Sequence, residues 1–517
     1  MIREHMRAAG QRLTQVIRAA EVMVGRVGGV LSLSAISLGV DRLANGSERV
    51  FAYQVAEPRV DREGALPLTR SASSFGLLIL LVMGLALGSA LRSVEGSSSP
   101  AEAVGAGNET FASYLPIIAG PLAPDVGHRD FGYGRANAPT GQKPQSKLWH
   151  NDGVWWGDLY NTATDRYEIY RFDWAAQAWT STGAAIDRRA RSSADVLWDG
   201  NHLYVASAVP PGQSGDLNAY LFRYSYSSAS KTYSLDTGYP VSLGSVAVDA
   251  IVLDKDTTGK IWITYTLDTS STARSVYVMR STTDDRTFTP PFVVPTNGST
   301  NLTSQDISAV VAFNSQIGVM WSNQANDAIY FAIHRDGDPD NAWSLNPALQ
   351  GPRYADDHIS IKSLQADPSG QVFAAVKTSL NDVNPPTSTQ PLVLLLTMDQ
   401  HGSWSRRTFG RVVDSHTRPI VLLDRQNREV YVFATVPVGS PTNGAIYYKK
   451  VSLDDQSMQF AVGPGTPFIS FGIYTHINNA SSTKQALDSS TGLLVVAGDD
   501  TSKYYFHNVL DLGATNP

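Results

Sequence analysis

Two histidines, an arginine and several lysines and carboxylates stand at equivalent points of a repeated pattern in this chain of 517 residues. His358 and His416 are candidate general bases, because an imidazole titrates near neutral pH. Arg418 or a lysine could neutralise the carboxylate of a uronate. The residues expected to bind a ligand are Lys147, Asp195, Asp306, Asp357, Arg418 and Lys484. Together they predict a site for an acidic or polyhydroxy sugar. In the alternative interpretation, these polar groups bond one another, water and the ends of strands.

A second group could bind a metal ion. The stretch 336–341 places carboxylates at alternate positions, Asp336, Asp338 and Asp340. Oxygen ligands at this spacing suit calcium, although the distal Glu of an EF-hand loop is missing and acidic hairpin tips show the same pattern. No other cofactor is expected. The chain has no cysteine, which excludes disulfides, thiolate zinc sites and a cysteine nucleophile.

The elements that must position these residues are short strands in seven repeats. Each repeat has two apolar runs separated by an Asp or Asn turn, followed by a strand rich in Tyr and Phe. The centres of these third strands are Tyr170, Phe222, Val278, Phe331, Leu395, Tyr448 and Phe506. Successive centres are 52 to 64 residues apart, and a period near 50 with about four strands per unit is typical of one propeller blade.

First strands with their terminal turns are predicted at 147–151, 195–199, 250–254, 310–314, 363–367, 420–424 and 484–488. Second strands are predicted to begin at Val154, Leu203, Ile261, Ile317, Val372, Val430 and Leu493. Apolar runs of this length suit strands that pack on both faces between neighbouring blades. The predicted fold is therefore all-β, a seven-bladed β-propeller of four-stranded blades.

The last repeat lacks an outer strand. Propellers commonly close by taking a strand from the other end of the chain, which removes an exposed sheet edge. The stretch 129–135, just before the first blade, is the expected donor.

The first 127 residues differ from the repeats. Residues 75–91 form an apolar run without charge, preceded by ten Arg and no Lys. This asymmetry predicts a membrane-targeting helix at 71–92, with the N-terminus inside. Small residues at Gly88 and Ala90 would allow cleavage, so an uncleaved anchor and a signal peptide both remain open. Residues 1–70 are either a cytoplasmic segment or lie upstream of the true translation start.

Residues 93–127 are rich in Ser, Gly, Ala and Pro and predict a flexible tether. Residues 128–517 form the propeller domain, which is expected outside the cytoplasmic membrane, either anchored or secreted. The formal charge of −6 and the pI near 5.9 give no indication of nucleic-acid binding.

The turn Ser281-Thr-Thr-Asp-Asp-Arg-Thr-Phe288 resembles the Asp-box of the sialidase-like, or BNR-repeat, superfamily of propellers. Thr282, Asp284, Thr287 and Phe288 match that motif. The stretch beginning Asp356-Asp-His-Ile359 is similar to the Asp-Asp-His-Asn that opens a blade in BNR-type propellers, ulvan lyases among them, with Ile359 in place of Asn. The Arg-Ile-Pro motif of true sialidases has no counterpart, so the resemblance does not imply sialidase activity.

Two functions follow as expectations. The first is a recognition module that binds a glycan or a surface protein. The second is a carbohydrate-active enzyme, either a polysaccharide lyase or a glycoside hydrolase. Two carboxylic acids facing one cleft would favour hydrolysis. A His–Tyr–Arg cluster without such a pair would favour a lyase, and a face whose polar groups bond only each other would favour a scaffold.

Overall fold

The computed structural model describes residues 36–42, 48–54 and 125–513, except 138, 271–272, 364–369, 385, 439 and 473–474. The chain divides into two compact units, residues 1–115 and 116–517. In the first unit, β1 (Ile36–Arg42) and β2 (Glu48–Gln54) form an antiparallel hairpin, which the sequence did not predict. The predicted targeting helix at 71–92 and the tether at 93–127 lie outside the described residues, apart from 125–127. No helix among the described residues is long and apolar enough to span a membrane.

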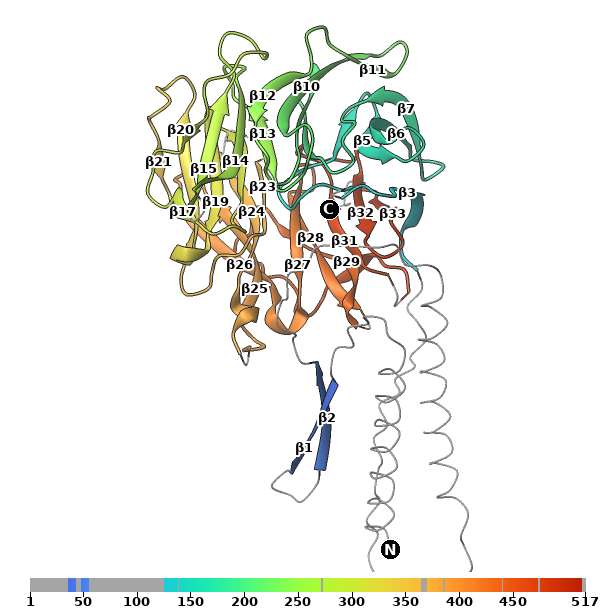
Figure 1. The fold of residues 1–517 in the computed structure, drawn as a ribbon, viewed down its shortest axis with the longest axis vertical. Helices are drawn as coiled ribbons and strands as arrows, with labels where there is room; N and C mark the ends of the chain where they lie inside the picture. Colours follow the sequence, from blue (N-terminus) through green and yellow to red (C-terminus); the bar gives the residue numbers. More distant parts are fainter. Residues whose placement is uncertain are drawn as a thin grey trace, which may run out of the picture. The chain divides into compact units, whose positions relative to one another are not determined.

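The second unit is the predicted propeller of seven antiparallel sheets (Figure 1). Blade 1 comprises β4 (Leu148–Asn151), β5 (Val154–Asn161), β6 (Arg166–Asp173) and β7 (Ala178–Ala185). Blade 2 comprises β8 (Ser193–Trp198), β9 (His202–Ala208), β10 (Asn218–Ser227), β11 (Thr232–Leu235) and β12 (Val241–Ser245). Blade 3 comprises β13 (Ile251–Lys255), β14 (Ile261–Ser270), β15 (Ala273–Arg280), β16 (Phe292–Val293) and β17 (Thr300–Leu302).

Blade 4 comprises β18 (Ser308–Phe313), β19 (Gln316–Asn323), β20 (Ala328–Arg335), β21 (Ser344–Leu345) and β22 (Leu349–Gln350). Blade 5 comprises β23 (Ile359–Ser363), β24 (Val372–Lys377), β25 (Pro391–Met398) and β26 (Trp404–Arg411). Blade 6 comprises β27 (Thr417–Asp424), β28 (Glu429–Val438), β29 (Ser440–Ser452) and β30 (Thr466–Ile469). Blade 7 comprises β31 (Ile477–Ser481), β32 (Leu493–Asp499), β33 (Tyr504–Leu510) and β3 (His128–Gly132). Short 3-10 helices cover Gln324–Asn326, Leu380–Asp382 and Val412–Asp414.

The first strand of each blade lies innermost, because the first strands of neighbouring blades contact one another around the ring. We call the face where these strands begin the mouth face. We call the opposite face, which carries the turns between first and second strands, the turn face. All seven predicted third-strand centres lie in the third strands, and their apolar side chains pack between blades.

Two of the seven predicted first strands are wrong in position. In blade 5 the strand is β23 (Ile359–Ser363), and most of the predicted stretch 363–367 lies outside the described residues. In blade 7 it is β31 (Ile477–Ser481) rather than 484–488. Residues 484–488 instead run beside blade 6, where Leu487 forms a parallel bridge to Asp424. Both true strands are rich in Ser, Asn and Lys, so they carry a weak apolar signal.

The ring closes as predicted. β3 pairs antiparallel with β33 and forms the outer strand of blade 7 (Figure 1). Phe131 stacks on Tyr170 of blade 1 and meets Tyr505 of blade 7, with ring centroids 4.8 and 5.2 Å apart. The buried imidazole of His507 bonds the carboxylate of Asp130 through Nδ1 at 2.8 Å. Closure therefore combines strand pairing, aromatic packing and one buried polar pair.

We expect a chain that begins at Gly134 to melt at least about 5 °C below a chain that begins at Pro116. Removing β3 exposes the edge of β33 and takes away the packing of Phe131. Differential scanning calorimetry of the two chains measures the difference. Equal melting temperatures would contradict the role of β3 in closure.

Candidate functional site

The segment 139–147 runs across the mouth face and contacts four blades. Thr140 donates to the carbonyl of Asn479 in blade 7 at 2.6 Å, and Gln145 donates to the carbonyl of Ile251 in blade 3 at 3.0 Å. The backbone N–H of Ser146 donates to Asp195 in blade 2 at 2.7 Å. Lys143 forms an ion pair with Asp357 in blade 5. We call residues 139–147 the crossing segment.

His358 is the centre of a polar cluster at the mouth face, immediately before β23. Its Nδ1 hydrogen-bonds Asp356 and lies 2.6 Å from a carboxylate oxygen of Asp357. Its Nε2 faces the hydroxyl of Thr417, the first residue of β27, at 3.4 Å. Because the carboxylates accept at Nδ1, they fix the orientation of the ring. Nε2 is left directed at the junction of blades 5 and 6.

Two lysines balance the charge of these carboxylates. Lys377, the last residue of β24, pairs with Asp356 at 2.5 Å, and Lys143 pairs with Asp357. Burial opposes ionisation of Asp357, but the hydrogen bond and charge of His358 and the charge of Lys143 hold its pKa well below the usual range.

The ligand atoms of Asp356, Asp357 and His358 lie within 4.8 Å of one another, close enough to share a metal ion. The two ammonium groups already compensate both carboxylates, so a cation would have to displace them. The cluster therefore fits a positioned imidazole better than a metal site.

Inner strands of blades 6 and 7 carry the same irregularity at the mouth face. The register with the second strand shifts between Thr417 and Ile420, and again between Asn478 and Ser481. Within these bulges Arg418 and Asn479 are left-handed, each with φ of 52°. Such a backbone is unfavourable for residues other than Gly and recurs at functional sites, where bulges redirect side chains.

Both bulged residues also have an unsatisfied polar atom. The Nε of Arg418 and the Oδ1 of Asn479 are buried without a hydrogen-bond partner. Among the residues that the structure describes, no hydrogen bond or ion pair reaches the guanidinium of Arg418. An unpaired buried donor costs about 1–3 kcal/mol unless a ligand satisfies it. We call Lys143, His358, Thr417, Arg418 and Asn479, with Asp356, Asp357 and Lys377, the mouth site.

The mouth site includes three of the predicted residues, Asp357, His358 and Arg418. The residues predicted to bind a ligand did not include the other five members, Lys143, Asp356, Lys377, Thr417 and Asn479. Asp356 stands next to a predicted residue and could have been found from it. The ion pair of Lys143 joins residues 214 positions apart and has no local sequence signal.

Four other predicted residues have their charged groups bonded within the protein. Asp195 accepts from the N–H of Leu253 at 2.9 Å and pairs with Lys484 at 2.9 Å inside the channel. Lys147 is fully buried and pairs with Asp158. Asp306 is fully buried and accepts from the backbone of Thr303 and Gln324.

A lysine that the sequence did not single out lies in the channel. Lys362 of β23 donates to the hydroxyl of Ser146 at 3.1 Å. Burial and the nearby charge of Lys484 lower its pKa to about 7. Lys362 therefore shares the channel with Lys484 and Asp195, beneath the crossing segment.

His416 lies apart from the mouth site. It is fully buried, and its Nε2 donates to the carbonyl of Pro464 at 2.9 Å, so its Nδ1 is the unprotonated nitrogen and has no partner. The ring packs against Phe409, with centroids 4.8 Å apart. A Cβ at Gly410 would stand 2.1 Å from Nδ1, so glycine is required there. No atom of His416 is placed to reach a ligand.

The three carboxylates of 336–340 lie on the turn face, in the loop between β20 and β21. Asp336 accepts from the N–H of Thr257 at 2.9 Å, and Asp340 accepts from Arg280 at 2.6 Å. Among the described residues these three are not part of a group whose ligand atoms converge on one point. Calcium binding there stays a prediction.

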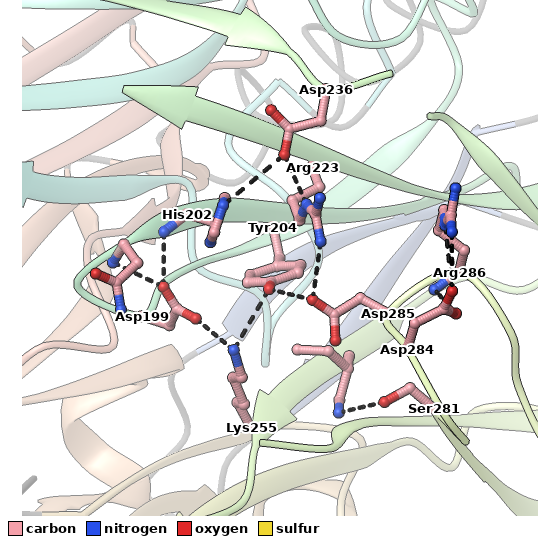
Figure 2. A network of polar contacts seen from close by, with 12 residues as sticks. Asp199, His202, Tyr204, Arg223, Asp236, Lys255, Ser281, Asp284, Asp285 and Arg286 are labelled. Carbon is pink, nitrogen blue, oxygen red and sulfur yellow. Dashed lines mark hydrogen bonds and ion pairs between the residues drawn. The ribbon is translucent and has the colours of Figure 1, made fainter. Parts of the chain in front are cut away.

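The turn face also carries a His–Tyr–Arg cluster, shown in Figure 2. The network comprises Asp199, His202, Tyr204, Arg223, Asp236, Lys255 and Asp285. Tyr204 donates to Asp285 at 2.5 Å, and Arg223 donates to Asp285 at 3.2 Å and to Asp236 at 2.6 Å. Tyr204 is fully buried, so its hydroxyl cannot protonate a substrate. The network ties blade 2 to blade 3 and is not arranged for catalysis.

No family model and no curated protein matches this chain. Several solved structures are similar to it. The periplasmic gluconolactonase of Pseudomonas aeruginosa is 15% identical with a TM-score of 0.41, over 69% of this chain and 94% of that one. The intramolecular trans-sialidase of Ruminococcus gnavus is 12% identical with a TM-score of 0.35, over 75% and 98%. An α-L-arabinofuranosidase of Lactobacillus brevis is 14% identical with a TM-score of 0.31, over 52% and 94%.

An intramolecular trans-sialidase is thus among the structures similar to this chain. At these identities and scores the comparisons carry no inference about activity. The propeller architecture rests on the seven sheets themselves.

We expect His416 to make the propeller less stable in acid. Burial lowers its pKa from 6.5 to about 4. The unfolded chain therefore takes up a proton near pH 6.5 while the folded chain does so only near pH 4. Stability is retained above pH 6.5 and is lost progressively as the pH falls to 4, by at most about 3 kcal/mol.

His416→Gln should flatten the dependence of the unfolding free energy on pH between 4 and 6.5, measured by denaturant titration. The exposed His401 provides the matched control, His401→Gln, which should keep the parental slope. An unchanged slope in His416→Gln would contradict a neutral buried imidazole.

Proposed function

We propose that the propeller binds an acidic glycan at the mouth site, as a recognition module. The observation that supports this most strongly is Arg418. Its guanidinium is unpaired among the described residues, its Nε is buried and its backbone is strained. A carboxylate or sulfate of a glycan would satisfy this donor with two parallel hydrogen bonds.

The charges around Arg418 support an anionic ligand. Lys143 and Lys377 each neutralise one carboxylate, which leaves Arg418 as an uncompensated cation. Asn479 adds an amide whose Oδ1 has no partner and could accept from a sugar hydroxyl. The site therefore offers one charged contact and several neutral ones.

The resemblance of the sequence to sialidase-like propellers agrees with a carbohydrate ligand. The proposal also places the propeller outside the cytoplasmic membrane, because the apolar run 75–91 follows ten arginines. Protease added to intact spheroplasts should then digest the propeller.

Arg418→Ala should weaken binding of a polyuronate such as polygalacturonate or alginate about tenfold or more, as expected for loss of a charge-assisted hydrogen bond. Isothermal titration calorimetry measures the affinity. Raised ionic strength should weaken binding by the parent chain and have less effect on Arg418→Ala.

Arg286→Ala is the matched control. Arg286 lies on the turn face, pairs with Asp284, and its side chain is 54% exposed. This variant should bind as the parent does. The proposal fails if both arginine variants bind equally well, or if the parent binds no acidic glycan.

A second candidate is a polysaccharide lyase, favoured by the arrangement of His358. The two carboxylates at Nδ1 fix the orientation of the imidazole, and Nε2 faces Thr417, the neighbour of Arg418 in the chain. In β-elimination, Nε2 would take the proton at C5 of a uronate whose carboxylate Arg418 neutralises. The C4–O bond then breaks, a C4=C5 double bond forms, and the imidazolium returns its proton to the leaving oxygen.

Hydrolysis is less well supported, because both nearby carboxylates are held by lysines and by His358.

If the chain is a lyase, it should release products that absorb in the ultraviolet through the new conjugated double bond. His358→Gln should abolish this release while leaving the melting temperature and polyuronate affinity near the parental values. A parent chain that yields no such product from polyuronates leaves recognition as the function.

A further inference from the structure

A cavity of about 490 Å³ lies on the turn face between blades 1 and 7, at the opposite ends of the inner strands from Arg418. Its walls come from the end of β4, the turn between β6 and β7, and residues 489–492 before β32. The volume is within the range of small-molecule sites, roughly 300–1,000 Å³. None of its residues takes part in the mouth site.

The indole of Trp174 provides an aromatic surface in this cavity. Trp174 is 39% exposed. Among the described residues, it is the only tryptophan in the group of large apolar residues that are exposed to solvent. Gly492, with φ of 59°, lies against the ring, and a Cβ there would stand 2.5 Å from Cη2 of Trp174. Phe172 meets the indole edge-on, with centroids 6.2 Å apart. The ring is thus held in place while much of it stays open to solvent.

The imidazole of His150 lines the cavity, and neither of its ring nitrogens has a hydrogen-bonding partner among the described residues. The backbone N–H and C=O of His150 both bond the side-chain amide of Gln485. Burial lowers the pKa of His150, so the ring is neutral at pH 7 and offers one donor and one acceptor.

The charges favour a neutral ligand. Asp173 and Asp511 line the cavity, so a bound carboxylate would face two acids. A sugar ring has an apolar C–H face that can stack on an indole and hydroxyls that both donate and accept. A neutral imidazole and a carboxylate complement those hydroxyls.

We infer that this cavity is a binding site for a neutral pyranose, with Trp174 as the stacking platform and His150 as a hydrogen-bonding group. This inference stands on different residues from the proposed function and adds a second, independent sugar contact on the other face of the ring.

The test uses neutral trisaccharides, xylotriose, cellotriose and maltotriose, with the full chain and saturation-transfer NMR to measure affinity. At least one should bind with a dissociation constant in the millimolar range. Trp174→Ala should weaken that binding about tenfold or more, and Trp174→Phe less, since a smaller ring keeps part of the stacking. His150→Ala should also weaken it.

Trp198→Phe, a half-buried tryptophan of blade 2, is the matched aromatic control and should leave binding unchanged. Arg418→Ala should also leave it unchanged, which separates this site from the mouth site. The melting temperature of each variant shows whether it is folded. If Trp174→Ala is unfolded, the affinities of Trp174→Phe and His150→Ala test the inference. The inference is overturned if the parent binds none of the three trisaccharides, or if the Trp174 and His150 variants bind as tightly as the parent.

Discussion

The innermost strand of every blade is a sheet edge, and its unpaired N–H and C=O groups must find partners inside the molecule. Polar side chains of neighbouring blades supply them. Asp195 bonds the N–H of Ser146 on one side and of Leu253 on the other, and Asp254 bonds the N–H of Ala312. Ser363 bonds the carbonyl of Ala312. The polar residues that line the axis are therefore largely occupied in joining the blades.

The need to pair these backbone groups divides the candidate residues into those that are bonded between blades and those that lack a partner. Where a carboxylate or lysine joins two inner strands, it is buried and bonded, as Asp195 is. The bulges of blades 6 and 7 break the regular ladder, and the side chains at these points lack partners. Function is expected where the bonding between blades is incomplete, because only there can a ligand satisfy a polar group without displacing one already bonded.

The sequence predicted the seven blades because apolar residues alternate with turns in every repeat, and burial between blades imposes that pattern. It placed the first strands of blades 5 and 7 wrongly, because polar residues interrupt the apolar run. These residues bond the neighbouring blade or the crossing segment, and they are Ser360, Lys362, Asn478 and Ser481. It found Asp357, His358 and Arg418 from their position before or within inner strands. It could not show that His416 turns away beneath Phe409, since that depends on the room left by a glycine in another strand. The ion pair between Lys143 and Asp357 depends on tertiary structure alone.

Closure by β3 also determines the order in which the ring can be completed during synthesis. Asp130 and His507, which bond across the closing strand pair, are 377 positions apart in the chain. At about 5–20 residues per second, their meeting is delayed by roughly 20 to 75 s after β3 is made. For that time the face of blade 1 that carries Tyr170 and Phe172 is not covered by blade 7. Exposed apolar surface makes an unfinished chain prone to aggregation, so the synthesis of the last strand determines when this risk ends.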